Sequence, residues 1–185
     1  MLEELDSAWN AQWPDCEPLG FLFAGRSNPL WVRFHHLPES KRYPDSEEEY
    51  QVILGRYHAL LAELGLGDRC FVTAAFYPYP DLSGPLERSA ILPRSRFWRM
   101  ALQDPDGTQA HVFATEVAHP SEELDAVIRL VVDEELTGTL ILPPDASWLV
   151  HAYDGGADVV SASTERRDEL RERFIEWVPD NVLGL

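Results

Sequence analysis

WLVHAYDGGADVV, residues 148–160, contains two strand-like runs joined by a pair of glycines. With Gly155-Gly156 as a two-residue turn, the two runs form a β-hairpin in which Tyr153 faces Asp158. Side chains alternate between the two faces of a strand, so His151, Tyr153 and Asp158 are expected to share one face. This hairpin is the starting point for predicting the rest of the sheet.

The polar face of the hairpin has two interpretations. A histidine, a phenol and a carboxylate that lie together can support general acid-base chemistry or weak metal binding. In the alternative, this face meets solvent and Asp154 stabilises the turn with its side chain. The solvent-facing interpretation is favoured because such loose spacing recurs in many hairpins, and no metal site is expected.

Strand-like and helical patterns extend outward from this hairpin. Strands outnumber helices and short turns join several of them, which favours a largely antiparallel sheet over a parallel one. A turn at Asp104-Pro105-Asp106-Gly107 predicts one more hairpin, and a Pro/Ser/Gly-rich loop precedes it, ending near residue 94. The predicted strands cover residues 19–25, 30–37, 69–78, 96–103, 110–117, 138–143, 147–153 and 157–163. The predicted helices are a short N-terminal one and those at 46–64, 121–131 and 164–178.

These elements predict an α+β fold, in which a largely antiparallel sheet packs against about three to four helices. Residues 1–185 are expected to form a single domain, with an N-terminal helix and connector at 1–18 and a core at 19–178. The strongest helical pattern begins where Ser46 and Glu49 form a potential capping box. Its apolar stripe includes Leu61 and marks it as the central support of the sheet.

The formal net charge of -17 is distributed unevenly along the chain. Residues 1–100 hold 14 acidic and 10 basic side chains, whereas residues 101–185 hold 18 acidic side chains and 5 arginines. A surface this acidic repels nucleic acid and anionic membranes. It would attract a basic protein partner, and the alternative is that the charge serves solubility alone. With 15 basic residues against 32 acidic ones, we expect neither nucleic-acid nor membrane binding.

Cysteine usage and the N-terminal sequence point to a cytoplasmic protein. Cys16 and Cys70 are too few for a disulfide framework or a thiolate metal site. The N-terminal sequence MLEELDSAWNAQW lacks the basic and apolar regions of a signal peptide. No stretch approaches the ~18 apolar residues of a membrane span. We expect no cofactor, and the oligomeric state stays open.

A second stretch, RFHHLPESKRYP (residues 33–44), gathers the only lysine and two of the six histidines. Alternation along a strand places Arg33 and His35 on one face. Lys41 and Arg42 precede a helix start that already carries several carboxylates, which satisfy the helix dipole and repel a phosphate. Internal ion pairing is therefore the favoured interpretation, followed by contact with a partner or ligand, and then by catalysis.

No metalloprotease, phosphate-loop, serine-hydrolase or dinucleotide-binding motif occurs in the chain. The leading hypothesis is a non-enzymatic acidic binding protein that engages a basic protein partner. Its candidate binding residues are Arg33, His35, Glu39, Lys41, Arg42, Tyr153, Asp154 and Asp158, with Gly155 and Gly156 as a structural turn. The alternative is a small hydrolase-like enzyme, which requires the 30–37 strand to lie beside the 148–160 hairpin. Its candidate catalytic residues are His35, His151, Tyr153 and Asp158.

Together, the two stretches resemble the RFHxLPESKRY and HxYDGGxD motifs of a family of uncharacterised small bacterial domains. The resemblance extends from about residue 19 to 178, and Ala152 stands where the family pattern would have proline. The matching positions are Arg33, Phe34, His35, Leu37, Pro38, Glu39, Ser40, Lys41, Arg42, Tyr43, His151, Tyr153, Asp154, Gly155, Gly156 and Asp158. Some members are loosely associated with bacterial Rhs/Vgr-type toxin-delivery elements. The resemblance therefore implies an immunity or accessory role and assigns no reaction.

The two stretches are expected to meet in space. Asp154 and Asp158 lie in the acidic half of the chain, so a cation from the N-terminal half is the nearest source of neutralising charge. We expect Glu39, Lys41 or Arg42 to lie within reach of the loop at 153–158, and we expect Arg42 to couple with Asp158.

Overall fold

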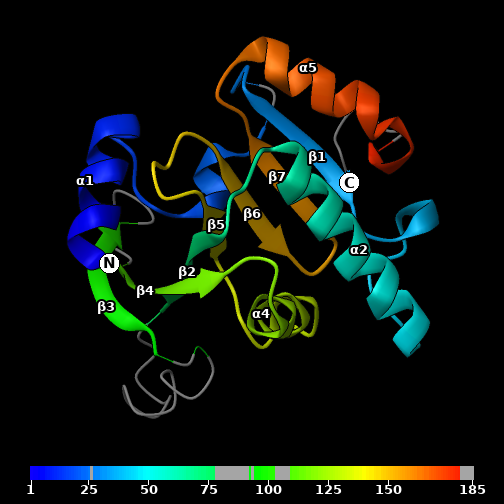
Figure 1. The fold of residues 1–185 in the computed structure, drawn as a ribbon, viewed down its shortest axis with the longest axis horizontal. Helices are drawn as coiled ribbons and strands as arrows, with labels where there is room; N and C mark the ends of the chain where they lie inside the picture. Colours follow the sequence, from blue (N-terminus) through cyan, green and yellow to red (C-terminus); the bar gives the residue numbers. More distant parts are fainter. Residues whose placement is uncertain (26, 78–91, 93, 103–108, 180–185) are drawn as a thin grey trace.

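The computed structural model describes residues 1–25, 27–77, 92, 94–102 and 109–179. Within these residues, seven strands form one sheet in the order β1-β7-β6-β5-β2-β4-β3 (Figure 1). Every neighbouring pair in this sheet is antiparallel. The sheet and the four α-helices of the described residues confirm the predicted α+β fold.

The element bounds agree with the sequence patterns in most of the chain. The hairpin of β3 and β4 was predicted, and the turn at 104–107 lies outside the described residues, as does most of the preceding loop. The strands are β1 Trp31–His35, β2 Arg69–Phe76, β3 Arg96–Leu102, β4 Gln109–Ala118, β5 Thr139–Leu142, β6 Leu149–Tyr153 and β7 Gly156–Val160. The helices are α1 Leu2–Gln12, α2 Glu47–Glu63, α4 Glu122–Val132 and α5 Thr164–Arg173. Three short 3₁₀ helices are η1 Gly20–Phe23, η2 Pro38–Ser40 and η3 Ile175–Trp177.

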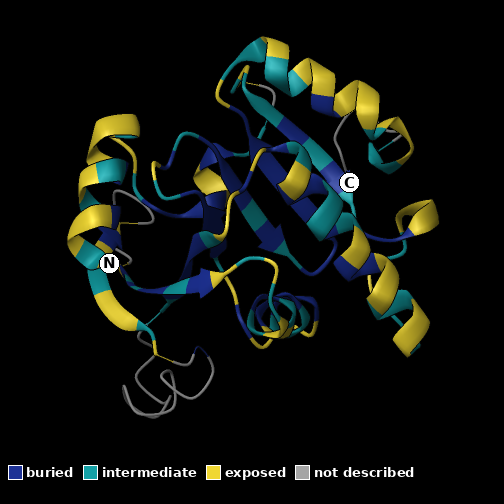
Figure 2. Ribbon diagram, in the orientation of Figure 1, coloured by how far each residue is buried: buried dark blue, intermediate teal, exposed yellow. Residues whose placement is uncertain are grey.

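Helical segments cover both faces of the sheet. On one face, Ile53 of α2 and Leu124 of α4 share a hydrophobic core with Val150 of β6, and α5 adds to the same core. On the other face, Trp9 of α1 packs in a second core with Phe71 of β2, and η1 adds to that one. Figure 2 shows the buried strands between helices whose outer sides are exposed. The sheet is therefore the middle layer of the molecule.

Helix α2 begins at the predicted cap. The Ser46 hydroxyl accepts a hydrogen bond from the Glu49 backbone N–H, which satisfies one of the free donors of the first turn. The reciprocal bond of a capping box differs, because the Glu49 carboxylate accepts from the backbone N–H of Asp45 at 2.6 Å. Ser121 caps α4 in the same way by accepting from Leu124.

The predicted strand at 19–25 is wrong, because this segment folds as the 3₁₀ helix η1. Leu19 and Phe23 are buried, while Phe21 and Leu22 between them are exposed, which is the burial pattern of a turn of helix. The Asn28 side chain donates to the Phe23 carbonyl at 2.9 Å and fixes the end of the segment. The apolar run predicted a strand, but only one side of this helical turn, with Leu19, Gly20 and Phe23, is buried against the sheet. The last predicted helix also differs, since α5 ends at residue 173 and η3 follows it.

The register of the β6–β7 hairpin also differs from the prediction. Tyr153 pairs with Gly156 and His151 pairs with Asp158, so residues 154 and 155 form the connection and Gly156 belongs to β7. Gly156 is needed in the strand, because a Cβ there would lie 2.1 Å from the Phe34 carbonyl oxygen of β1. The shift is two residues, which keeps every side chain on its predicted face.

None of the helices in the described residues is both long enough and apolar enough to cross a membrane.

Leu61 tests the predicted apolar stripe of α2. Leu61 is 0% exposed, so Leu61→Ala should reduce the free energy of unfolding by about 2 to 5 kcal/mol through lost burial and a residual cavity. Val52→Ala on the same helix is the control, since Val52 is exposed and should change stability by less than about 0.5 kcal/mol. Urea unfolding measures both variants. A loss below about 0.5 kcal/mol for Leu61→Ala would show that the buried face has been misassigned.

Candidate functional site

Three neighbouring strands place an arginine, a carboxylate and a histidine in one row. β1 pairs with β7 so that Arg33 lies opposite Asp158, and β7 pairs with β6 so that Asp158 lies opposite His151. Residues in register across antiparallel strands project to the same face. The strand at 30–37 therefore lies beside the 148–160 hairpin, as the enzyme hypothesis requires.

Arg33 binds Asp158 with two hydrogen bonds. Its Nε donates to Oδ1 at 2.7 Å and a terminal nitrogen donates to Oδ2 at 2.8 Å, which is the bidentate geometry of a strong guanidinium–carboxylate pair. The guanidinium also lies 5.4 Å from the centre of the Trp31 ring and 5.3 Å from that of Tyr153. These contacts fix the arginine over the face of the sheet.

The row is covered by the segment that precedes β1. A Cβ on Gly20 of η1 would lie 2.1 Å from Cδ2 of the His151 ring, so only glycine allows η1 to approach so closely. The side chain of Asp158 is 3% exposed and that of His151 is 12% exposed. The favoured interpretation of a solvent-facing polar surface was therefore wrong, because η1 packs on that face.

Burial and ion pairing set the protonation of the row. Burial alone would raise the pKa of the Asp158 carboxyl, but the hydrogen bonds and the charge of Arg33 outweigh burial and lower the pKa. Burial raises the pKa of Tyr153, and the nearby Asp158 carboxylate raises it further. Asp158 is therefore ionised and Tyr153 is a neutral phenol at neutral pH.

A second ion pair ties the loop after β1 to the hairpin connection. Arg42 Nε donates to the Asp154 carboxylate, so the two sequence motifs meet as expected. The predicted partner was wrong, because Arg42 pairs with Asp154 and Arg33 takes Asp158. Strand register explains the difference, because Arg33 lies directly opposite Asp158 where β1 pairs with β7.

His36 strengthens the same loop from inside. Burial lowers the pKa of His36, so its ring is neutral and its Nε2–H donates to the Arg42 carbonyl oxygen at 2.9 Å. Burial would raise the pKa of Asp154, but the hydrogen bond and the charge of Arg42 lower it. The loop, the ion pair and the hairpin connection form one hydrogen-bonded unit.

The remaining candidate binding residues lie around this unit. Lys41 donates to Asp45 at 2.8 Å and to Glu49 at 2.6 Å, so it neutralises the start of α2 as predicted. Glu39 is exposed in η2 and has a left-handed backbone conformation with φ of 56°. His35 lies in register with Gly156, and its carbonyl accepts a hydrogen bond from Arg56 of α2 at 2.8 Å.

These contacts favour a structural role for the row over a catalytic one. Both oxygens of Asp158 are engaged by Arg33, which leaves this carboxylate poorly placed to accept a substrate proton. His151 Nδ1 lies 3.9 Å from Asp158 Oδ2, beyond hydrogen-bonding distance. Across the described part of the chain, no group of three histidine, cysteine or acidic side chains is arranged to hold a metal ion.

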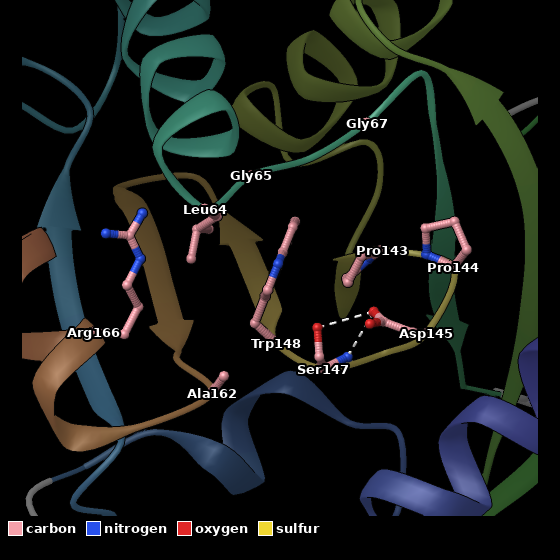
Figure 3. Close-up of a pocket in the computed structure, with 10 residues that line it drawn as sticks. All are labelled: Leu64, Gly65, Gly67, Pro143, Pro144, Asp145, Ser147, Trp148, Ala162 and Arg166. Carbon is pink, nitrogen blue, oxygen red and sulfur yellow. Dashed lines mark hydrogen bonds between the residues drawn. The ribbon is translucent and has the colours of Figure 1, made fainter.

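Sequence reasoning missed a separate hollow at the C-terminal end of α2 (Figure 3). Its volume is about 450 Å³. The lining residues are Leu64, Gly65, Gly67, Pro143, Pro144, Asp145, Ser147, Trp148, Ala162 and Arg166. The glycines and prolines identified these segments as loops, but the sequence could not show that three distant loops meet.

The structure is thus an α+β protein with a seven-stranded antiparallel sheet, tied across its β1–β7–β6 end by two ion pairs. The chain belongs to the family described as domain of unknown function DUF3885, which matches residues 19–181. No curated protein matches the chain, and no solved structure matches it. The family match agrees with the resemblance to an uncharacterised family and gives no reaction.

The two ion pairs should differ in energy because they differ in burial. Arg33→Ala should cost about 3 to 5 kcal/mol, because it leaves Asp158 buried without its cation. In a double-mutant cycle with Asp158→Ala, the combined loss should be well below the sum of the single losses. Urea unfolding at neutral pH measures the cycle.

The pair whose cation is exposed provides the matched comparison. The Arg42 side chain is 59% exposed, whereas that of Asp154 is 11% exposed. Because solvent screens the guanidinium, the Arg42→Ala and Asp154→Ala cycle should give at most about 1 kcal/mol of coupling. Arg42→Ala and Asp158→Ala should be additive within about 0.5 kcal/mol. Equal coupling in the buried and the exposed pair would contradict the assigned geometry.

The lowered pKa of Asp158 predicts a specific pH dependence. A carboxyl whose folded pKa lies below its unfolded value of about 3.9 stabilises the protein above that value, and the contribution is lost as pH falls through the folded pKa. The stability difference between wild type and Asp158→Asn should therefore shrink from pH 7 to pH 3. Denaturant unfolding across this range measures the difference, with the exposed Asp15→Asn as control. A constant difference would argue against the ionised pair.

Proposed function

We propose that the chain is a non-enzymatic acidic binding protein that engages a basic protein partner. The observation that carries the proposal is a group of carboxylates at the start of α2 and the end of α4, here called the α2–α4 acidic surface. It consists of Asp45, Glu47, Glu48, Asp133, Glu134 and Glu135. All six of these residues are exposed.

Hydrogen bonds join the two halves of this surface. Tyr50 of α2 donates to Asp133, and Tyr43 donates to Glu134 at 3.4 Å. Arg129 of α4 pairs with Glu47, which links the two helices directly. These contacts hold the carboxylates in a fixed arrangement, which lowers the entropic cost of ordering them for a partner.

The surface keeps an excess of negative charge after internal pairing. Among the described residues, the cations in ion pairs with its carboxylates are Lys41, bound to Asp45, and Arg129, bound to Glu47. Tyr43 is 47% exposed beside these groups, and tyrosine is enriched among residues that dominate binding energy. Carboxylates around an exposed aromatic ring suit a partner with a basic surface.

The resemblance to domains associated with Rhs/Vgr-type elements supports an immunity or accessory role for such binding. A hydrolase-like site at His35, His151, Tyr153 and Asp158 has less support, because Arg33 occupies the carboxylate and the phenol pKa is raised. An inhibitor with complementary charge gains association rate, and this gain decreases as salt concentration rises.

Charge reversal on the α2–α4 acidic surface tests the proposal. The tagged protein should capture a basic partner from a bacterial lysate at low salt, and the complex should dissociate as salt is raised. Glu48→Lys/Glu135→Lys should weaken the purified complex by at least about tenfold, since like charges across an interface cost several kcal/mol. Isothermal titration calorimetry measures the affinity.

Glu3→Lys/Glu172→Lys is the matched control. It changes the net charge by the same amount at exposed positions on α1 and α5, so it should retain most of the affinity. Equal weakening by both double variants would show attraction to net charge alone and would reject the α2–α4 acidic surface. Absence of any bound protein across salt conditions would reject the proposed function.

A further inference from the structure

The hollow at the end of α2 has an apolar wall that includes a tryptophan. In Figure 3, Trp148 stands between Leu64 and the Pro143–Pro144 pair, and Asp145 and Ser147 lie beneath the prolines. Its volume of about 450 Å³ lies within the range of small-ligand sites. Trp148 belongs to the hydrophobic core and is only 5% exposed, so the indole presents an edge to the hollow. This edge and the neighbouring prolines can contact the apolar stem of a long side chain.

The polar groups of the hollow favour a cation over an anion. The guanidinium of Arg166 is already engaged, because it donates to the carbonyl and carboxylate of Glu63 and to Glu169. Asp145 is exposed, and its Oδ1 accepts from the backbone N–H and hydroxyl of Ser147 at 3.2 and 2.9 Å. Among the ion pairs of the described residues, none includes Asp145. The arginine is thus committed, whereas the aspartate can still bind a positive charge.

Gly67 lines another side of the hollow, and its backbone conformation does not require glycine. A Cβ on Gly67 would meet no atom within 4 Å, and its φ lies outside the left-handed range. Gly65, by contrast, has φ of +79° at the end of α2 and needs glycine for its conformation. A side chain at position 67 is therefore compatible with the fold and would narrow the hollow.

We infer that the hollow binds an arginine side chain presented by a partner protein. The aliphatic stem would lie against Pro144 and the exposed edge of Trp148, and the guanidinium would reach the Asp145 carboxylate. Charge complementarity selects this occupant, because an anionic ligand would meet Asp145 and would find Arg166 already bound to carboxylates.

The inference rests on the proposed function for the identity of the partner and deepens it by naming one side chain of that partner. Helix α2 has 17 residues, so its two ends lie about 25 Å apart at a rise of about 1.5 Å per residue. The α2–α4 acidic surface and the hollow can therefore lie within one interface of about 800 Å² per partner.

The binding test uses two small probes that differ in charge. N-acetyl-arginine amide is titrated into the full-length protein and followed by ¹H–¹⁵N NMR, with the Trp148 indole signal assigned from Trp148→Phe. The expected result is a saturable shift of the Trp148, Gly67 and Ser147 signals. N-acetyl-citrulline amide has nearly the same shape without the charge, and it should bind about tenfold more weakly.

Two variants and a control locate the probe. Asp145→Asn keeps an oxygen that can accept from Ser147, and it should weaken binding of the arginine probe about tenfold. Gly67→Val should weaken binding by narrowing the hollow, while the rest of the NMR spectrum stays native. Glu172→Gln removes one negative charge from an exposed position of α5 outside the hollow, and it should leave the affinity unchanged.

Three outcomes would overturn the inference. They are shifts that avoid Trp148 and Gly67, equal binding of the arginine and citrulline probes, and equal effects of Asp145→Asn and Glu172→Gln. The captured partner separates this inference from the proposed function. Partner affinity that depends on the α2–α4 acidic surface but not on Asp145 or Gly67 would reject the arginine pocket alone. Probe binding without any captured partner would support the pocket and reject the proposed function.

Discussion

The buried carboxylate of Asp158 is the constraint on which the rest of the structure depends. A charge in the middle of β7 is tolerated only when a cation reaches it, and Arg33 does so from β1 with two hydrogen bonds. The same register brings the Phe34 carbonyl against Gly156. It also turns Val32 and Phe34 toward the core that β1 shares with α2 and α5. One ion pair thus fixes the edge strand, the hairpin and the helical layer relative to each other.

The sequence predicted elements whose signals are local. Ser46 and Ser121 cap the two central helices through their own neighbouring backbone, so both helices could be predicted without tertiary information. The register of the hairpin could not be predicted in this way, because the position of Gly156 depends on the close approach of β1 and not on turn chemistry. The strand expected at 19–25 failed for a similar reason, since packing on the sheet buries Leu19 and Phe23 and leaves the middle of the run exposed.

The sequence predicted that the two motifs lie close together, but it did not predict which residues form the ion pairs. A shortage of cations in the acidic half indicated that the two motifs meet, and Arg42 and Asp154 confirm that contact. Which arginine reaches which carboxylate depends on strand register, and no pattern in the sequence determines it. The α2–α4 acidic surface and the hollow near Trp148 combine loops far apart in the chain. The two sequence motifs that most resembled a functional site therefore hold parts of the fold together. The proposed binding surfaces lie instead at the two ends of α2.

The pairing of β1 with β7 also sets the order in which this chain can fold during its synthesis. Arg33 and Asp158 are 125 residues apart, so at translation rates of about 5 to 20 residues per second β1 emerges roughly 6 to 25 s before its partner. Contacts of such long range also form late in folding, because closing the intervening loop costs entropy before any contact is gained. During this interval Val32 and Phe34 have no β7 beside them. A nascent chain therefore carries β1 without its strand partner until β7 has been synthesised.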